Sequence, residues 1–107
     1  DKSKRPLMGM AACEIADRVI VTSDNPRFEN PLSIIEDIKV NIKNNPKLRC
    51  EADRREAIFS AISEAQKGDV VVIAGKGHEN YQEINGIRNH FSDIEAATEA
   101  IKIRNSK

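Results

Sequence analysis

The sequence of 107 residues contains no tryptophan, one tyrosine, three phenylalanines and only two cysteines, Cys13 and Cys50. The two cysteines have no CxxC spacing, so we expect reduced thiols in a cytoplasmic protein and predict no metal site. No hydrophobic run approaches the roughly 20 residues that span a bilayer, and the polar first residues lead into no secretory signal. We therefore expect no membrane partner.

Charge of one sign is not in excess either, because 17 Lys and Arg residues balance 17 Asp and Glu residues. Without net charge the chain exerts no long-range attraction on a polyanion, so we expect no nucleic-acid partner. Hydrophobic residues make up 39% and charged residues 32%, a composition typical of one compact domain. The chain begins with Asp1, and its polar first residues lead directly into a helical pattern. We expect it to be part of a longer protein.

The hydrophobic pattern predicts an α/β domain, because helical periodicity alternates with short β-branched runs. Helices are predicted at 6–17, 31–42, 53–65 and 92–104. Strands are predicted at 19–22 and 70–74, whose unbroken apolar runs are typical of strands covered on both faces, and a short strand at 47–51. Asn85-Gly86 predicts a two-residue turn between the strands of a hairpin, 81–84 and 87–90. The expected fold is a three-layer α/β/α, Rossmann-like domain with a mostly parallel sheet and a C-terminal hairpin.

Two loops, 23–30 and 75–81, follow the predicted strands at their carboxyl ends, where open α/β sheets bind ligands. The first contains Asp24-Asn25-Pro26-Arg27. Arg27 can bind a carboxylate through two parallel hydrogen bonds while Asp24 binds an ammonium, which would suit an amino acid. The same residues also fit an ordinary turn with an aspartate cap and a solvated arginine.

The second loop, Gly75-Lys76-Gly77-His78-Glu79, allows close backbone approach to a ligand but lacks the Lys-Ser/Thr ending of a P-loop. It is not a dinucleotide fingerprint, because Asn80 stands where the third glycine belongs. His78 fits a proton donor, a phosphate contact or a structural hydrogen bond, and we interpret His90 as structural.

Three cations precede the first helix, and they fit either a phosphate site or a solvated basic end: Lys2, Lys4 and Arg5. The charges of Arg54-Arg55-Glu56 and of 95–102 are interpreted as the solvent-facing sides of amphipathic helices.

Three segments taken together resemble the carboxy-terminal domain of the Mur ligases, and most closely its MurE type: residues 1–8 (DKSKRPLM), 22–27 (TSDNPR) and 74–82 (AGKGHENYQ). The resemblance extends over the whole chain, 1–107, and implies a single domain of a larger three-domain enzyme. It also implies that a strand and a Gly-Gly-Asp-Arg segment precede Asp1. The sheet of this chain would then lack its first strand, and the site would lack one arginine.

The resemblance implies an ATP-dependent ligase of peptidoglycan synthesis, and hence a role in cell-wall formation, cell shape and division. The parent enzyme would phosphorylate the D-glutamate carboxylate of UDP-N-acetylmuramoyl-L-alanyl-D-glutamate, and the amine of meso-diaminopimelate would attack the acyl phosphate. ATP and Mg²⁺ would be bound mainly by a central domain and the UDP-sugar by an amino-terminal one. We therefore expect no ligase activity from these residues alone. A non-catalytic α/β module that binds an amino acid or a phosphorylated ligand is the alternative.

The resemblance also assigns residues to the site. Those expected to bind meso-diaminopimelate are Asp24, Asn25, Pro26, Arg27, Gly75 and Glu79. Candidates for contact with the phosphates of the nucleotide or of the acyl phosphate are Lys4, Arg5, Lys76 and His78.

Overall fold

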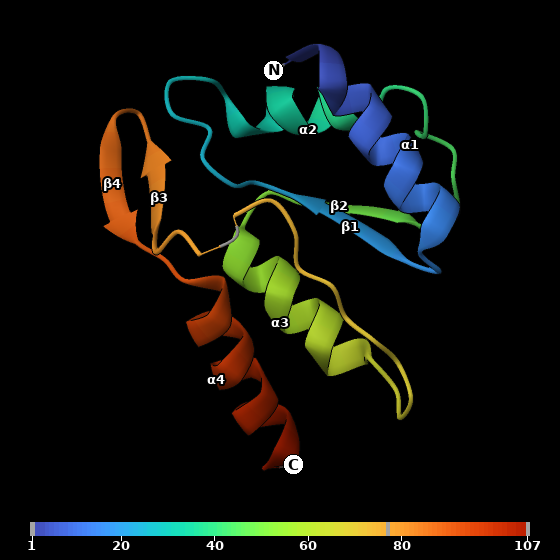
Figure 1. Ribbon diagram of the computed structural model, residues 1–107, viewed down its shortest axis with the longest axis vertical. Helices are drawn as coiled ribbons and strands as arrows, with labels where there is room; N and C mark the ends of the chain where they lie inside the picture. The colour runs from blue at the N-terminus through green and yellow to red at the C-terminus, as the bar shows by residue number, and fades with distance from the viewer. Residues whose placement is uncertain (1, 77, 107) are drawn as a thin grey trace.

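The computed structural model describes residues 2–76 and 78–106. Figure 1 shows helices on both sides of a small parallel sheet, with a separate hairpin at one end. In chain order the elements are a 3₁₀ turn (Lys2–Lys4), α1 (Arg5–Ile15), β1 (Val19–Thr22), α2 (Pro31–Lys39), β2 (Leu48–Glu51), α3 (Arg54–Glu64), β3 (Tyr81–Ile84), β4 (Ile87–His90) and α4 (Asp93–Asn105).

The parallel sheet consists of β1 and β2, with Val19 opposite Leu48 and Thr22 opposite Glu51. Helices α1 and α2 lie on one side of it and α3 on the other, with α4 packed beside α3 (Figure 1). This arrangement confirms the predicted α/β class with helices on both faces. None of the helices in the described part of the chain has the length and hydrophobicity that crossing a membrane requires.

Three helices begin at residues whose side chains accept a backbone N–H of the first turn. These caps are Asn30 Oδ1 to Leu32 N at 2.8 Å, Asp53 Oδ1 to Glu56 N at 3.1 Å and Ser92 Oγ to Glu95 N at 3.3 Å. Helix α2 ends at Lys39, earlier than predicted, because residues 40–44 form turns before Pro46.

Two helix pairs form the packed interior. Helices α3 and α4 share a buried apolar cluster of Ile58, Ile62, Ala96 and Ala100. On the other side of the sheet, Gly9 of α1 lies so close to α2 that a Cβ there would collide with the backbone carbonyl of Ile38. Glycine is therefore required at this crossing by packing and not by backbone conformation.

The strand predicted at 70–74 is wrong: the structure assigns no strand to this segment. Val70 and Val72 are 85% and 81% exposed, although the sequence pattern predicts burial on both faces. A β-branched run becomes a strand only when a neighbour supplies a hydrogen-bond ladder. Among the described residues β1 pairs only with β2, and no strand pairs with 70–74.

The predicted hairpin is present. Strands β3 and β4 are antiparallel, and Asn85 and Gly86 at the turn have φ angles of 52° and 76°, as a two-residue turn of this type requires. An isolated bridge joins Ile84 of the hairpin to Arg27. The hairpin therefore packs against the loop after β1, outside the parallel sheet.

Candidate functional site

The two loops singled out from the sequence meet in the structure, and Asn25 is one of the residues that join them. Its side-chain Nδ2 donates to Glu79 Oε1 at 3.1 Å, and its Oδ1 accepts the backbone N–H of Glu83 at 2.8 Å. One amide group thus holds the loop after β1 against both the second loop and strand β3. The structure thus brings Asn25 and Glu79, two of the residues that the resemblance assigns to the amino-acid site, within hydrogen-bond distance of each other.

Asp24 faces a cation of its own chain. The ammonium of Lys76 lies 2.7 Å from Asp24 Oδ1 and donates to the carbonyl of Tyr81, also at 2.7 Å. The side chain of Lys76 is fully buried. Gly75 lies beside this pair with φ of 108°, a conformation that L-residues rarely adopt. Asp24 is therefore paired with Lys76, a cation of its own chain.

Arg27 combines a constrained backbone with an exposed side chain. Its φ of 55° lies in the left-handed region, and its N–H donates to the carbonyl of Glu83 at 2.9 Å. A non-glycine residue in this region costs energy, and such residues often lie at functional sites. In the part of the chain that the structure describes, the guanidinium has no hydrogen-bond or ion-pair partner. It is available to bind a carboxylate.

Glu79 is half-buried, and its carboxylate is only partly used by the protein. Oε1 accepts from Asn25, and Oε2 lies 3.3 Å from the hydroxyl of Tyr81. A carboxylate has about four acceptor positions, so further positions remain for the hydrogens of an ammonium group. Tyr81 and Asn25 were not singled out as supports of Glu79 by local sequence reasoning, because both contacts depend on the tertiary fold.

The described geometry can be compared with known proteins. Residues 1–77 match the family model described as "Mur ligase, glutamate ligase domain". The chain belongs to the Mur ligase family. It is 52% identical over 101 residues to the UDP-N-acetylmuramoyl-L-alanyl-D-glutamate–2,6-diaminopimelate ligase of Bacteroides thetaiotaomicron, and 54% identical over 101 residues to the ligase of the same name from Aquifex aeolicus.

These alignments cover most of this Mur ligase domain and a small part of each relative. They include 92% and 94% of the chain but 21% of each of the two ligases. A solved structure of a ligase of the same name superimposes with a TM-score of 0.92 at 51% identity, covering 98% of this chain and 22% of that one. The chain thus spans about a fifth of the length of the relatives that it matches.

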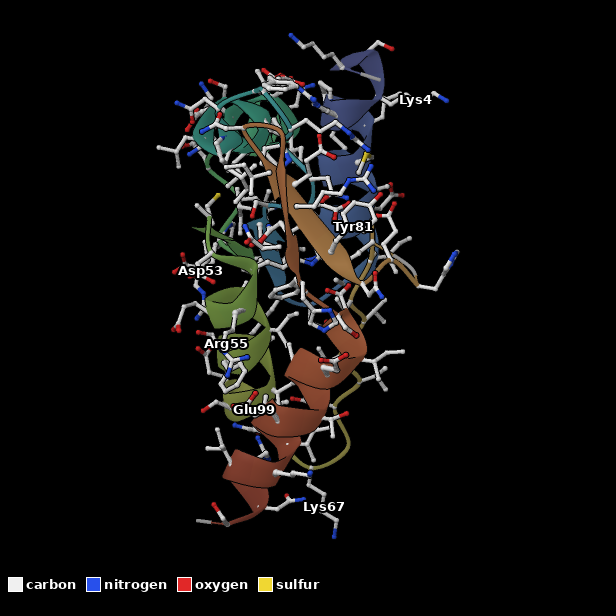
Figure 2. The ribbon with its side chains drawn as sticks, turned by 90° about the vertical axis from the view of Figure 1, so that its left-hand side faces the viewer. Lys4, Asp53, Arg55, Lys67, Tyr81 and Glu99 are labelled. Carbon is white, nitrogen blue, oxygen red and sulfur yellow. The ribbon has the colours of Figure 1, made fainter. Side chains whose placement is uncertain are left out.

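The four candidates for phosphate contact lie in different surroundings in the Mur ligase domain. Lys4 is exposed and points away from the body (Figure 2), and His78 is exposed as well. Lys76 is buried against Asp24. Arg5 donates to both oxygens of Glu29, at 2.8 and 3.0 Å, and to Asp37 at 3.0 Å.

The ion pairs of Arg5 join α1 and α2 to the loop after β1. The hydrogen bond to Glu29 raises the pKa of the Arg5 guanidinium above its ordinary value, and the pKa of Glu29 is lowered in turn. Arg5 is therefore held by Glu29, near the end of the loop, and by Asp37 of α2.

Arg54 of the Mur ligase domain is buried, and its interpretation as a solvent-facing charge is wrong. Its Nε and one terminal nitrogen donate to the two carboxylate oxygens of Asp93 at 2.8 and 2.7 Å. Only 3% of the Arg54 side chain is exposed. The next residue, Arg55, does lie at the surface beside Glu99 (Figure 2). One sequence feature could have indicated the burial of Arg54. It is a cation in the first turn of a helix, where an anion is favoured, so it needs an anionic partner.

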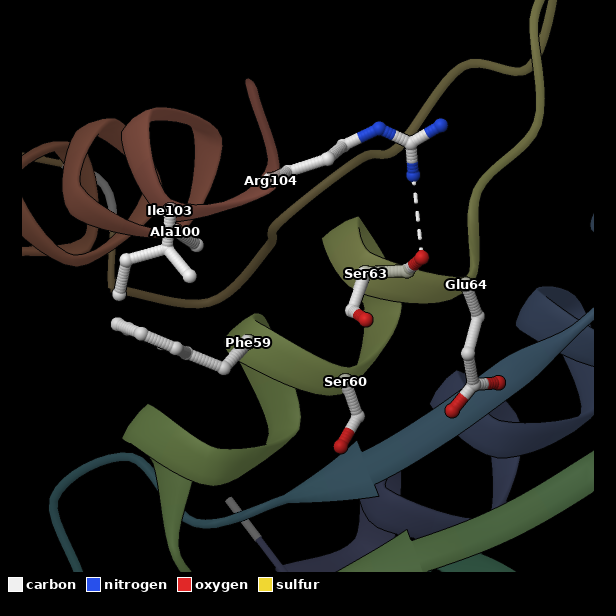
Figure 3. Close-up of a pocket in the computed structure, with 7 residues that line it drawn as sticks. All are labelled: Phe59, Ser60, Ser63, Glu64, Ala100, Ile103 and Arg104. Atoms are coloured by element: carbon white, nitrogen blue, oxygen red, sulfur yellow. Dashed lines mark hydrogen bonds between the residues drawn. The ribbon is translucent and has the colours of Figure 1, made fainter. Parts of the chain in front are cut away.

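A hollow between α3 and α4 lies apart from these loops (Figure 3). Its lining residues are Phe59, Ser60, Ser63, Glu64, Ala100, Ile103 and Arg104, none of which the sequence assigns to the site. Arg104 donates to the backbone carbonyls of Ile62 and Ser63 at 2.7 and 3.1 Å, and so caps the end of α3.

The described residues contain no group of three metal-binding side chains among His, Cys, Asp and Glu.

Proposed function

We propose that this domain binds meso-diaminopimelate in an ATP-dependent ligase that adds this amino acid to UDP-N-acetylmuramoyl-L-alanyl-D-glutamate in peptidoglycan synthesis. The names of the similar proteins support the proposal. The observation that carries it is that one loop presents a positive group, Arg27, and the other a negative group, Glu79. Arg27 presents an unpaired guanidinium two residues from Asn25, which holds the partly satisfied carboxylate of Glu79.

This arrangement suits an amino-acid end group that carries a carboxylate and an ammonium. Arg27 binds the carboxylate through two parallel hydrogen bonds, and Glu79 accepts hydrogens from the ammonium. Meso-diaminopimelate carries a second carboxylate that lysine lacks. A bound lysine would leave Arg27 without its partner, and a site built for a polar group discriminates strongly against a ligand that lacks it.

The role of these residues in the reaction is to hold the amino acid. One end of meso-diaminopimelate is bound by Arg27 and Glu79, so its other amine is directed at the acyl phosphate of the muramoyl dipeptide. The nitrogen forms an amide bond to the acyl carbon, phosphate leaves with the electron pair of the broken carbon–oxygen bond, and the amine loses a proton. Positioning of this kind contributes to rate by converting an encounter into an oriented approach.

ATP and Mg²⁺ are assigned in this proposal to other parts of the ligase. The described residues contain no group of three candidate metal ligands. The glycine-rich loop has no Ser or Thr after its lysine, and the ammonium of Lys76 is committed to Asp24. Lys4 and His78, both exposed, remain the candidates in this domain for contact with a phosphate.

The proposal places the domain within a longer cytoplasmic enzyme, where ATP and the nucleotide-linked precursor are found. The relatives are about five times as long as the matched region. In this proposal other parts of the ligase cover the exposed side chains of Val70 and Val72. The alternative of a non-catalytic binding module is not favoured, because the relatives that match along the chain are ligases.

Kinetics of an Arg27→Ala variant of the ligase that contains this domain test the proposal. We expect the KM for meso-diaminopimelate to rise roughly 100-fold, in the range of a lost charged hydrogen-bond pair, with unfolding unchanged because the side chain is exposed. Arg18→Ala, which removes another exposed arginine, is the matched control. An unchanged KM in Arg27→Ala would show that the site is assigned wrongly.

A titration of the 107-residue chain with meso-diaminopimelate and, separately, L-lysine gives a second test. Amide resonances of 24–27 and 75–79 should shift with meso-diaminopimelate and not with lysine. Equal shifts with both ligands would contradict the assignment of Arg27 as the residue that selects the second carboxylate.

A further inference from the structure

We propose that Arg54 is a positioning residue of this site: it holds the two ligand-binding loops at one fixed separation. The inference rests on the proposed function, because it concerns the same amino-acid site. Arg54 touches neither Arg27 nor Glu79, but its guanidinium contacts both chain segments that lead into their loops. The side chain is 3% exposed, so these contacts are made in the interior.

The four hydrogen bonds of Arg54 divide into two pairs. One pair goes to the carboxylate of Asp93, at 2.8 and 2.7 Å. The other goes to two backbone carbonyls, Ser23 at 3.0 Å and Ala74 at 3.1 Å. The guanidinium is planar and rigid, so acceptors on its different nitrogens are held at a set distance and angle from one another.

The two carbonyls stand at matching places in the chain. Ser23 directly precedes Asp24, and Ala74 directly precedes Gly75. Since no strand pairing joins β1 to the 70–74 segment in the described structure, the usual backbone ladder between neighbouring strands is missing here. Arg54 therefore provides a direct link between the starts of the two loops from inside the domain. The Asn25–Glu79 hydrogen bond and the Lys76–Asp24 ion pair link the two loops further along the chain.

The surroundings of Arg54 argue against a role in stability alone. Arg54 is the first residue of α3, where the positive end of the helix dipole disfavours a cation. Asp93 is the first residue of α4, where an anion is favoured, and it compensates this charge. Replacing a buried ion pair by apolar residues is often neutral or stabilising, whereas apolar residues cannot bind two carbonyls at a fixed angle.

The N-terminal ends of α3 and α4 lie near each other beside the hairpin in Figure 1. Arg54 and Asp93, the first residues of these helices, are therefore positioned next to the two loops. Asp93 holds the guanidinium plane and Arg54 holds the loops. We therefore expect loss of the pair to affect binding of the amino acid and to leave the sites for the other substrates, which the proposal assigns to other domains, unchanged.

Two variants of the ligase that contains this domain test the inference. Arg54→Lys keeps the charge but cannot bind two carbonyls and a carboxylate with a planar fork. The double variant Arg54→Met/Asp93→Leu removes the ion pair and leaves no charge uncompensated. Arg55→Lys, at the neighbouring exposed position, is the matched control. For each protein the KM values for meso-diaminopimelate, ATP and the muramoyl dipeptide, the kcat and the thermal unfolding temperature are measured.

We expect both variants to raise the KM for meso-diaminopimelate by roughly 10- to 100-fold, the effect of displacing binding groups by about 1 Å, with the KM for ATP within about twofold of wild type. The double variant should unfold at a temperature slightly below that of wild type, because the carbonyls of Ser23 and Ala74 lose a hydrogen-bond donor although no charge is left uncompensated. The KM separates positioning from support of the fold, because a merely structural role would lower the unfolding temperature and leave the KM of the folded enzyme unchanged. An unchanged KM for meso-diaminopimelate in a folded Arg54→Lys or double variant would overturn the inference.

Hydrogen–deuterium exchange gives a readout that does not depend on catalysis. In the double variant, exchange should accelerate in both 23–30 and 75–81 and not in α1. Acceleration in neither loop, or in one loop only, would contradict a shared link. Arg27→Ala is measured beside these variants: if it also leaves the KM unchanged, the proposed function is wrong, whereas an effect of Arg27→Ala without an effect of the Arg54 variants would reject the positioning role alone.

Discussion

Lys76 lies with its ammonium 2.7 Å from Asp24 Oδ1, and its side chain is completely buried. The pair joins the glycine-rich loop to the loop after β1. Along the chain, Lys76 follows Gly75, whereas Ala74, which Arg54 binds, precedes it. Lys76 also donates to the carbonyl of Tyr81 and lies 5.9 Å from the centroid of the Phe91 ring. A lysine that the sequence assigns to phosphate contact thus forms an internal support of the site.

Lys76→Met should destabilise the protein by about 1–3 kcal/mol, because it removes the cation paired with the Asp24 carboxylate and the donor to the partly buried carbonyl of Tyr81. The lower part of the range applies if water solvates Asp24, which is 35% exposed. Urea-induced unfolding measures the change. Lys67→Met, at an exposed lysine that projects into solvent (Figure 2), is the control and should lie within about 0.5 kcal/mol of wild type.

An equal stability of Lys76→Met and wild type would contradict the structural role of Lys76. A normal stability combined with a raised KM for ATP would instead favour the phosphate contact that the sequence suggests.

Local signals predicted most of the elements that carry the site. Each helix cap at Asn30, Asp53 and Ser92 involves two residues that are at most three positions apart. The hairpin turn depends on two adjacent residues, Asn85 and Gly86. Such features depend on short stretches of chain, so the sequence contains what is needed to predict them.

The error at 70–74 has a different cause. A run of valines indicates that a segment is suited to a strand, but a ladder also needs a second backbone at the correct distance. The sequence pattern of 70–74 contains no information on whether such a partner is present. The loop that follows still reaches Asn25, although the expectation that 23–30 and 75–81 lie at one end of the sheet rested on a strand at 70–74.

The charged pairs could not be predicted for a related reason. Arg54 and Arg55 are adjacent and chemically identical, yet one is buried against Asp93 and the other is exposed beside Glu99. Which of them enters the interior depends on the rotation of α3 about its axis and on where α4 begins. The capping pattern at Asp53 predicts the start of the helix and leaves that rotation undecided.

The Arg5–Glu29 pair predicts a pH dependence of stability. Its hydrogen bond lowers the pKa of Glu29 from 4.5, so the folded state binds a proton less readily than the unfolded state. The stabilisation is present above pH of about 4.5 and is lost as pH falls through the lowered pKa. We expect the difference in unfolding free energy between wild type and Glu29→Gln to shrink between pH 7 and pH 3.

Chemical unfolding of both proteins across this pH range measures the difference. Glu14→Gln, at an exposed glutamate of α1, controls for the loss of one negative charge. A difference between wild type and Glu29→Gln that stays constant, or grows as the solution becomes more acidic, would show that Arg5 does not act through the ionised carboxylate.

Asn25→Asp separates the two hydrogen bonds by which Asn25 joins the loops. The aspartate keeps an oxygen for the N–H of Glu83 but cannot donate to Glu79 and places a second negative charge beside it. We expect the affinity for meso-diaminopimelate to fall roughly tenfold, because Glu79 loses the donor that orients it and repulsion turns it away. Calorimetric titration of the ligase, with Asn41→Asp as the control at an exposed asparagine of the 40–44 turns, measures this effect. Because the aspartate is nearly the same size as the asparagine, an affinity equal to that of wild type would mean that Glu79 is positioned by Tyr81 alone.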